Sequence, residues 1–182
     1  TVTDDADVTT VTLTATPSVV EGTNITYTAT LSNVAQTAVT VTLSTGQTIT
    51  ITAGATTGTV SIAAPGDDPY IDAGTVSRTI STATGGTFES LAINPAAAST
   101  NVTDDSDATT LTLTATPSVV EGTNITYTAT LTNAAQTAVT VTLSSGETIT
   151  IAAGATTGTV LVAAPSDDVY IDASTVSRTI ST

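Results

Sequence analysis

Acidic side chains occur in short clusters, and the densest is Asp104-Asp105-Ser106-Asp107. Three carboxylates within four residues repel one another unless a cation lies among them. The chain has only two basic side chains, Arg78 and Arg178, and neither is near this cluster in sequence. The same pattern opens the chain as Asp4-Asp5-Ala6-Asp7, 100 residues earlier. The first hypothesis is that these aspartates bind a divalent cation.

The composition restricts which ion and which partners the chain could bind. Sixteen acidic and two basic residues give a net charge of −14, which disfavours nucleic acids and anionic membranes because both bind Lys and Arg. The sequence has no Cys and no His, so it offers neither disulfides nor the usual zinc ligands. Oxygen-only coordination of a hard cation such as calcium remains. We find no signal peptide and no long apolar run that would insert into a membrane.

An internal repeat organises the whole sequence. Residues 1–82 align with residues 101–182 without gaps, and 68 of these 82 positions are identical. We therefore expect two domains, residues 1–103 and 104–182, with the acidic stretch Asn101–Asp107 acting as a hinge or clamp at the junction. The second copy stops before the counterpart of the last strand of the first. Because the chain opens and closes within the pattern, we expect it to be part of a longer array.

Within each copy, polar and apolar residues alternate with a period of two, as in half-buried antiparallel strands. Residues 10–15, 25–31, 39–43 and 49–52 show this alternation most clearly, and turn residues separate them. No segment has a helical period. About seven strands in about 100 residues predict an all-β fold of tandem immunoglobulin-like antiparallel β-sandwiches. The predicted inward set is Val11, Leu13, Ile25, Tyr27, Leu31, Val39, Val41, Ile49, Ile51, Val60, Ile62, Val76 and Ile80, with the residues 100 positions later.

Strand parity predicts that acidic residues far apart in sequence meet. If each strand reverses the direction of the last, the loop holding Glu21, the loop from Asp67 to Asp72 and the chain after the seventh strand lie at one end. Single acidic turns are common and are usually only solvated. Three such turns at one end, without bases, favour a cation site.

Four segments carry a resemblance to a known family: Pro-Ser-Val-Val-Glu-Gly, Ala-Gly-Ala-Thr-Thr-Gly-Thr-Val, Asp-Asp-Pro-Tyr-Ile-Asp and Val-Thr-Asp-Asp-Ser-Asp. The chain resembles the tandem extender repeats of giant RTX-type bacterial surface adhesins, including large ice-binding and biofilm adhesins. Calx-β and cadherin-like domains share a looser version of the pattern. The resemblance covers the whole chain.

The resemblance implies a cell-surface, extracellular protein exported by type I secretion, with Ca²⁺ at the inter-repeat junctions. Calcium would stiffen the array, which projects adhesive domains away from the cell. The partners would be neighbouring repeats of the same chain, with no nucleic acid, no membrane insertion, no small-molecule substrate and a monomeric state. The predicted metal ligands are Asp4, Asp5, Asp7, Glu21, Asp67, Asp68, Asp72, Asp104, Asp105, Asp107, Glu121, Asp167, Asp168 and Asp172.

Other functions have less support in the sequence. A β-sandwich that binds a carbohydrate or protein through its loops is the alternative, but the chain has only five aromatic residues for such a surface. The Thr-x-Thr runs could suggest ice binding, although a twisted sheet does not present a flat array. We expect no enzyme, because His, Cys and Lys are all absent. Arg78 and Arg178 fall on the inward parity, which predicts a bulge or an edge position from which the side chain reaches solvent.

Overall fold

Strands form wherever the sequence alternates, and β-branched residues supply most of them. The computed structural model describes residues 5, 7–170 and 174–181. In these residues there are fifteen strands and no helix, so none that could cross a membrane. The chain divides into two compact units, Thr1–Ser106 (unit 1) and Asp107–Thr182 (unit 2). The predicted all-β class with antiparallel sandwich sheets is confirmed.

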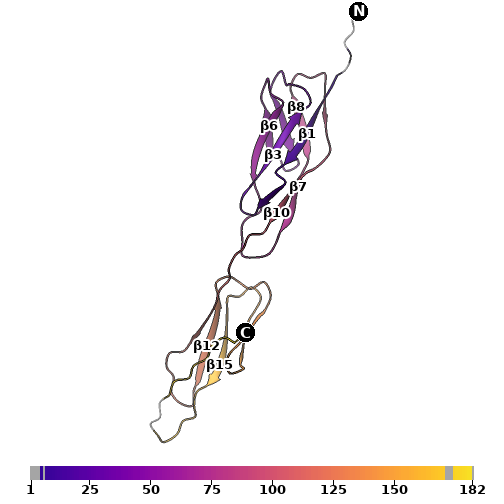
Figure 1. Cartoon of the computed structure of the whole chain (residues 1–182). Helices are drawn as coiled ribbons and strands as arrows, with labels where there is room; N and C mark the ends of the chain where they lie inside the picture. Colours follow the sequence, from indigo (N-terminus) through magenta and orange to yellow (C-terminus); the bar gives the residue numbers. More distant parts are fainter. Residues whose placement is uncertain (1–4, 6, 171–173, 182) are drawn as a thin grey trace, which may run out of the picture. The chain divides into compact units, whose positions relative to one another are not determined.

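Unit 1 contains ten strands in three sheets. They are β1 (Val8–Ala15), β2 (Ser18–Val20), β3 (Asn24–Leu31), β4 (Val39–Leu43), β5 (Thr48–Ile51), β6 (Thr57–Ala63), β7 (Gly74–Arg78), β8 (Ile80–Gly85), β9 (Ser90–Ile93) and β10 (Ala98–Thr103). The sheet β6-β3-β1-β9 and the sheet β5-β4-β8 enclose the core, and β2-β10-β7 forms the third sheet. Figure 1 shows β7 and β10 at the end of unit 1 that lies away from the N-terminus.

The core of unit 1 follows the predicted alternation. Inward residues of β1, β3, β4 and β5 are almost completely buried, and Tyr27 is the largest of them. Val60, Ile62 and Val76 are half-buried and pack against this core. The outward positions of β1, β3 and β6 pair threonine with threonine, as in Thr28 with Thr14 and Thr59. Alternate apolar and threonine faces therefore define which side of each strand is inside.

The segment predicted as a single strand around Val76 and Ile80 consists of two strands in different sheets. β7 pairs with β10, and β8 pairs with β4, with a register shift between Thr42 and Leu43. The change occurs at Thr79, directly after Arg78. The Arg78 guanidinium lies 5.7 Å from the centroid of the Tyr27 ring. The Arg78 Nε is buried with no hydrogen-bond partner among the described residues. Arg78 is half-buried at the end of β7, which is an edge strand of its sheet, in line with one of the two predicted alternatives, and it also makes a cation–π contact with Tyr27.

The segment predicted as the inter-domain linker is also partly a strand. Residues 101–103 belong to β10, which lies parallel to β2 and antiparallel to β7. Its inward residues Ala98, Thr100 and Val102 are buried, and the Thr100 hydroxyl donates to the Thr16 carbonyl at 2.7 Å. The prediction of seven strands was therefore wrong, because it missed β2 and β10 and joined β7 to β8.

Unit 2 repeats five of these strands: β11 (Leu111–Ala115), β12 (Asn124–Leu131), β13 (Val139–Thr142), β14 (Thr148–Ile151) and β15 (Thr157–Ala163). They form the sheet β11-β12-β15 and the pair β13-β14, with a separate core around Tyr127. A single bridge between Leu143 and Ile180 replaces the β4–β8 ladder. Ile180 was predicted to point inward but is 36% exposed, and among the described residues this one bridge is its strand pairing.

Candidate metal centre

Glu21 is the buried member of an acidic cluster in unit 1. It follows β2 directly, and only 4% of its surface is exposed. Its backbone amide donates to the Thr103 carbonyl at 3.0 Å, and its Oε1 accepts a hydrogen bond of 3.4 Å from the Asp105 amide. Because β10 pairs with β2, the chain that leaves β10 runs past Glu21.

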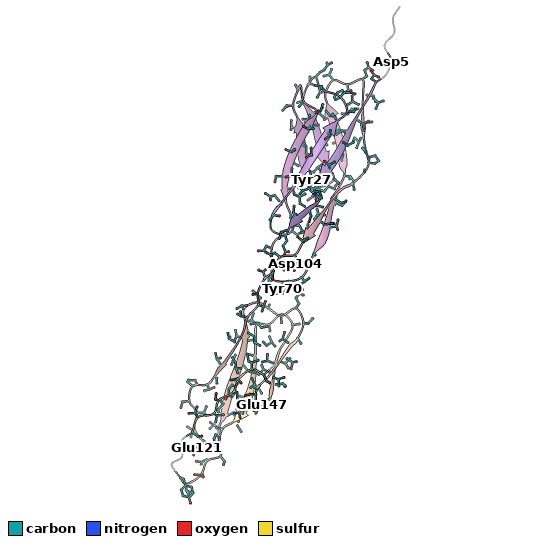
Figure 2. All side chains as sticks on the ribbon, in the orientation of Figure 1. Asp5, Tyr27, Tyr70, Asp104, Glu121 and Glu147 are labelled. Carbon is teal, nitrogen blue, oxygen red and sulfur yellow. The ribbon has the colours of Figure 1, made fainter. Side chains whose placement is uncertain are left out.

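Two groups of carboxylates share Glu21. In one, ligand atoms of Glu21, Asp72 and Asp104 lie within 4.8 Å of one another. In the other, Glu21 is joined within the same distance by Asp67 and Asp105. These are the only such groups of three found in the described part of the chain. Five carboxylates from three distant segments thus meet at one end of unit 1, where Figure 2 shows Asp104 and Tyr70.

Gly22 allows the loop after Glu21 to approach Asp67. Its φ of +68° lies in the left-handed region, which glycine adopts without strain. A Cβ at this position would lie 2.8 Å from the Cβ of Asp67, which is too close. The Gly22 amide also donates to the Pro65 carbonyl at 2.7 Å. The glycine therefore brings two segments of the acidic cluster together.

The electrostatics of the cluster disfavour a charged Glu21. Burial, followed by the neighbouring Asp104 and Asp72, raises the pKa of Glu21 from its usual 4.5 to about 7, against the lowering effect of the Asp105 amide. Both basic residues of the chain are engaged elsewhere: Arg78 lies over Tyr27, and Arg178 Nε lies 3.9 Å from Glu147 Oε2. A cation at this cluster would offset a repulsion that no basic side chain offsets.

The LapA domain matches residues 7–105 and again residues 107–182. The two matches cover both units and almost the entire chain. The chain belongs to the LapA domain family. Comparison with curated proteins gives no significant match. The resemblance to repeats of a large bacterial adhesin is confirmed at the level of this family.

Membership of the LapA family makes the chain a component of a large adhesin, and hence of a surface or extracellular protein. In the first LapA unit, the acidic cluster could hold a metal through oxygen ligands alone. Carboxylates are the ligands that hard divalent cations prefer, whereas Cys and His, which softer metals prefer, are absent from the sequence.

The other predicted ligands of the first LapA unit lie outside the two carboxylate groups. The Oδ1 of Asp68 accepts a hydrogen bond of 2.9 Å from the Tyr70 amide and so forms a turn within the loop. Asp5 and Asp7 are exposed, and Asp5 lies at the end of unit 1 opposite Asp104 (Figure 2). The Asp7 amide donates to the Glu89 carboxylate at 2.6 Å. Asp4 lies outside the described residues.

The second LapA unit has a looser version of the same loops. Asp107 is exposed at its start, and Glu121 lies near one end of the unit (Figure 2). The Gly122 amide donates to the Pro165 carbonyl at 2.7 Å, as in the first unit, but a Cβ on Gly122 would meet Asp167 Cβ at an acceptable 3.4 Å. Asp168 Oδ1 accepts a bond of 2.7 Å from the Tyr170 amide. Asp172 lies outside the described residues, and its role as a ligand stays a prediction.

Two residues that shape the acidic cluster around Glu21 were not predicted from the sequence. Gly22 belongs to the Pro-Ser-Val-Val-Glu-Gly segment, and its signal in the sequence is that glycine is the residue that supplies positive φ in turns. Thr103 supplies the carbonyl that fixes the Glu21 backbone. Its role depends on β10, and an alternation with threonine at an inward position does not predict β10 clearly.

Proposed function

We propose that the chain is a pair of structural extender repeats of an RTX-type bacterial surface adhesin, and that calcium bound at the Glu21 cluster stiffens the array. The observation that carries this proposal is the burial of Glu21 among four aspartates. Removing a carboxylate from water is costly unless a cation or several donors compensate it. The Asp105 amide donates to the Glu21 carboxylate at a long 3.4 Å, and the side chains around that carboxylate are themselves acidic.

Calcium fits this cluster better than other common cations. It accepts about six to eight oxygen ligands in flexible geometry, and the five carboxylates that meet here can supply several of them. Magnesium demands a tighter octahedron and retains its waters, so it should bind less well. We expect a dissociation constant of about 10⁻⁴–10⁻³ M, as in other extracellular calcium modules.

The stiffening mechanism follows from the position of Asp104 and Asp105 in the sequence. They come directly after β10, and only Ser106 separates them from the start of unit 2 at Asp107. An ion that binds these aspartates together with Glu21, Asp67 and Asp72 would restrain the chain where it leaves unit 1. Without the ion, the carboxylates repel and the residues after β10 would be more mobile. The mechanism needs no chemistry on a substrate, and we propose that the chain is not an enzyme.

Calcium would also couple folding to location. An ion that binds the assembled cluster and not the scattered carboxylates stabilises the folded state by mass action. In a compartment poor in calcium the repeat would fold less readily, which suits export through a narrow type I channel. Outside the cell, millimolar calcium would favour the folded and stiffened array. We propose that the chain acts there as a monomer whose partners are neighbouring repeats.

A calcium titration followed by small-angle scattering tests the proposal. Calorimetry should show calcium binding that magnesium does not match, and millimolar calcium should raise the maximum dimension of the intact chain. The variant Asp104→Ala/Asp105→Ala/Asp107→Ala should keep its strand content and lose the change in scattering. Asp5→Ala/Asp7→Ala is the control, because it also removes paired aspartates but none from the Glu21 groups. An unchanged rod-like profile in the triple variant would show that these aspartates do not stiffen the chain.

A further inference from the structure

Two hydrogen-bond donors in unit 1 are buried without an acceptor. The Tyr27 hydroxyl belongs to a side chain with no exposed surface, and the Nε of Arg78 is buried as well. Within the described residues, neither atom has a hydrogen-bond partner. Buried polar atoms are rarely left unpaired, because burial removes their hydrogen bonds to water. Two such donors in one unit therefore call for an acceptor from outside the chain.

The two donors border the same region of unit 1. The Arg78 guanidinium lies over the Tyr27 ring, 5.7 Å from its centroid. The Nε atom is part of that guanidinium, and the hydroxyl is a substituent of that ring. A guanidinium stays protonated at any physiological pH, so its positive charge is fixed. The region combines this charge with two donors, and it favours an acceptor that is negatively charged.

The corresponding region of unit 2 contains its own carboxylate. The Arg178 Nε lies 3.9 Å from the Oε2 of Glu147, which is an ion pair although the distance is too long for a hydrogen bond. The Tyr127 hydroxyl donates to the Val176 carbonyl at 3.4 Å. In unit 2 the protein therefore supplies both an anionic group for the arginine and an acceptor for the tyrosine.

Unit 1 lacks that carboxylate because position 47 is glutamine. The Gln47 Oε1 accepts a hydrogen bond from the Thr45 hydroxyl, and the neutral amide cannot offset the charge of Arg78. Arg78 is also the one charged residue in the ten strands of unit 1, since the acidic residues lie in the connecting segments. The charge that Glu147 balances in unit 2 is therefore left unbalanced in unit 1.

We propose that unit 1 binds a small monovalent anion, of the chloride or bromide class, between the Tyr27 hydroxyl and the Arg78 Nε. The positive charge attracts the anion, and the two donors replace part of its hydration shell. Arg78 is half-buried on an edge strand, so the anion can exchange with solvent. It links β3 to β7, which belong to different sheets, and stabilises unit 1 as the anion concentration rises.

A chloride titration of the intact chain in calcium-free buffer tests the proposal. The sequence has two arginines, no lysine and no histidine, so a nitrogen-15 spectrum contains two arginine Nε–H signals. With sodium gluconate keeping the ionic strength constant, the Arg78 signal should move and saturate, while the Arg178 signal stays. Chloride at about ten times its dissociation constant should lower the unfolding equilibrium constant of unit 1 about tenfold, with unit 2 as the internal control. Because calcium is absent, the result is independent of the proposed calcium site.

Variants at three positions sharpen the test. Gln47→Glu gives unit 1 the residue that unit 2 already has, so the fold is retained and the carboxylate should abolish the chloride response. Thr45→Ser, the other difference between the two β-turns, is the matched control and should retain the response. Tyr27→Phe removes one donor and should weaken chloride binding several-fold. Any stability that this variant gains in halide-free buffer should disappear when chloride is added to both proteins.

Three results would overturn the proposal: an Arg78 signal that ignores chloride, arginine signals that move alike, or a chloride response that survives in Gln47→Glu. A buried water between the two donors would give the first of these results, because water satisfies them without chloride. Bromide, located in a crystal by its anomalous scattering, should lie beside Tyr27 and Arg78. Bromide found at other surfaces alone would be an adventitious ion only, and the proposal would then be wrong.

Discussion

The amide of Asp105 donates a hydrogen bond to the carboxylate of Glu21, which lies 84 residues earlier in the chain. This contact joins the chain leaving β10 to the loop that follows β2. The donor is a backbone group, so the contact survives substitution of the Asp105 side chain. Glu21 can therefore be tested separately from the aspartates that surround it.

The first prediction concerns the ion. Glu21→Gln keeps the shape of the side chain and removes the one carboxylate common to both groups. Calcium affinity, measured by calorimetry, should fall by roughly 10- to 100-fold, because ligand charge sets affinity in such sites. Glu89→Gln removes a carboxylate that belongs to neither group and should leave the affinity unchanged. Equal affinities in the two variants would mean that the ion binds elsewhere.

The second prediction concerns pH. The pKa of Glu21 in the folded chain is about 7, above its ordinary 4.5. Without divalent cations, the folded state therefore disfavours the charged carboxylate, and the free energy of unfolding of unit 1 should fall as pH rises from about 4.5 to about 7. Calcium needs the carboxylate, so calcium affinity should rise over the same range. Denaturant titrations of the wild type and Glu21→Gln at several pH values check this, and the variant should lose most of the dependence.

The third prediction concerns the loop glycines. Gly22→Ala places a side chain in the left-handed region, at a cost of about 1–2 kcal/mol, and adds a clash with Asp67. Gly122→Ala carries the same backbone strain without the clash and is the matched control. Denaturation followed by amide signals of each unit should show the larger loss of stability for Gly22→Ala. Calcium affinity should fall only in that variant, and a fall in both would point to backbone strain alone.

The fourth prediction concerns the buried tyrosines. The Tyr27 hydroxyl is buried without a hydrogen-bond partner among the described residues, whereas the Tyr127 hydroxyl donates to the Val176 carbonyl at 3.4 Å. Tyr27→Phe removes an unpaired polar group and keeps the ring under Arg78, so it should stabilise unit 1 by about 1 kcal/mol. Tyr127→Phe loses a weak bond and should be neutral or slightly destabilising. Thermal unfolding of the two variants gives the comparison, and a destabilised Tyr27→Phe would show that the hydroxyl is satisfied in solution.

Much of the fold could be predicted from the sequence because threonine and apolar residues alternate so regularly. The period of two identified β1, β3, β4, β5 and β6 and the inward side of each. Strand parity also predicted that Glu21, Asp67, Asp72 and Asp104 would meet, because it needs only the direction of each strand and not the identity of its partner.

The parts that were missed depend on contacts with no local pattern. β10 places Thr100 inward, where its hydroxyl bonds to Thr16, and a polar inward residue hides the alternation. β7 and β8 are continuous in sequence, and only their different partners separate them at Thr79. The separate roles of Asp67 and Asp68 also depend on loop geometry, since one carboxylate faces Glu21 and the next bonds to the Tyr70 amide.

The parallel pairing of β1 with β9 and of β2 with β10 has a mechanical consequence. The early strands β1 and β2 lie beside the late strands β9 and β10, and the two ends of unit 1 lie at opposite poles (Figure 2). Tension applied through the chain would pull each parallel pair in opposite directions along the strand axis. Such a load shears all hydrogen bonds of a pair at once, instead of opening them one after another. A repeat whose early and late strands pair in parallel would therefore resist stretching when a cell pulls on its attachment.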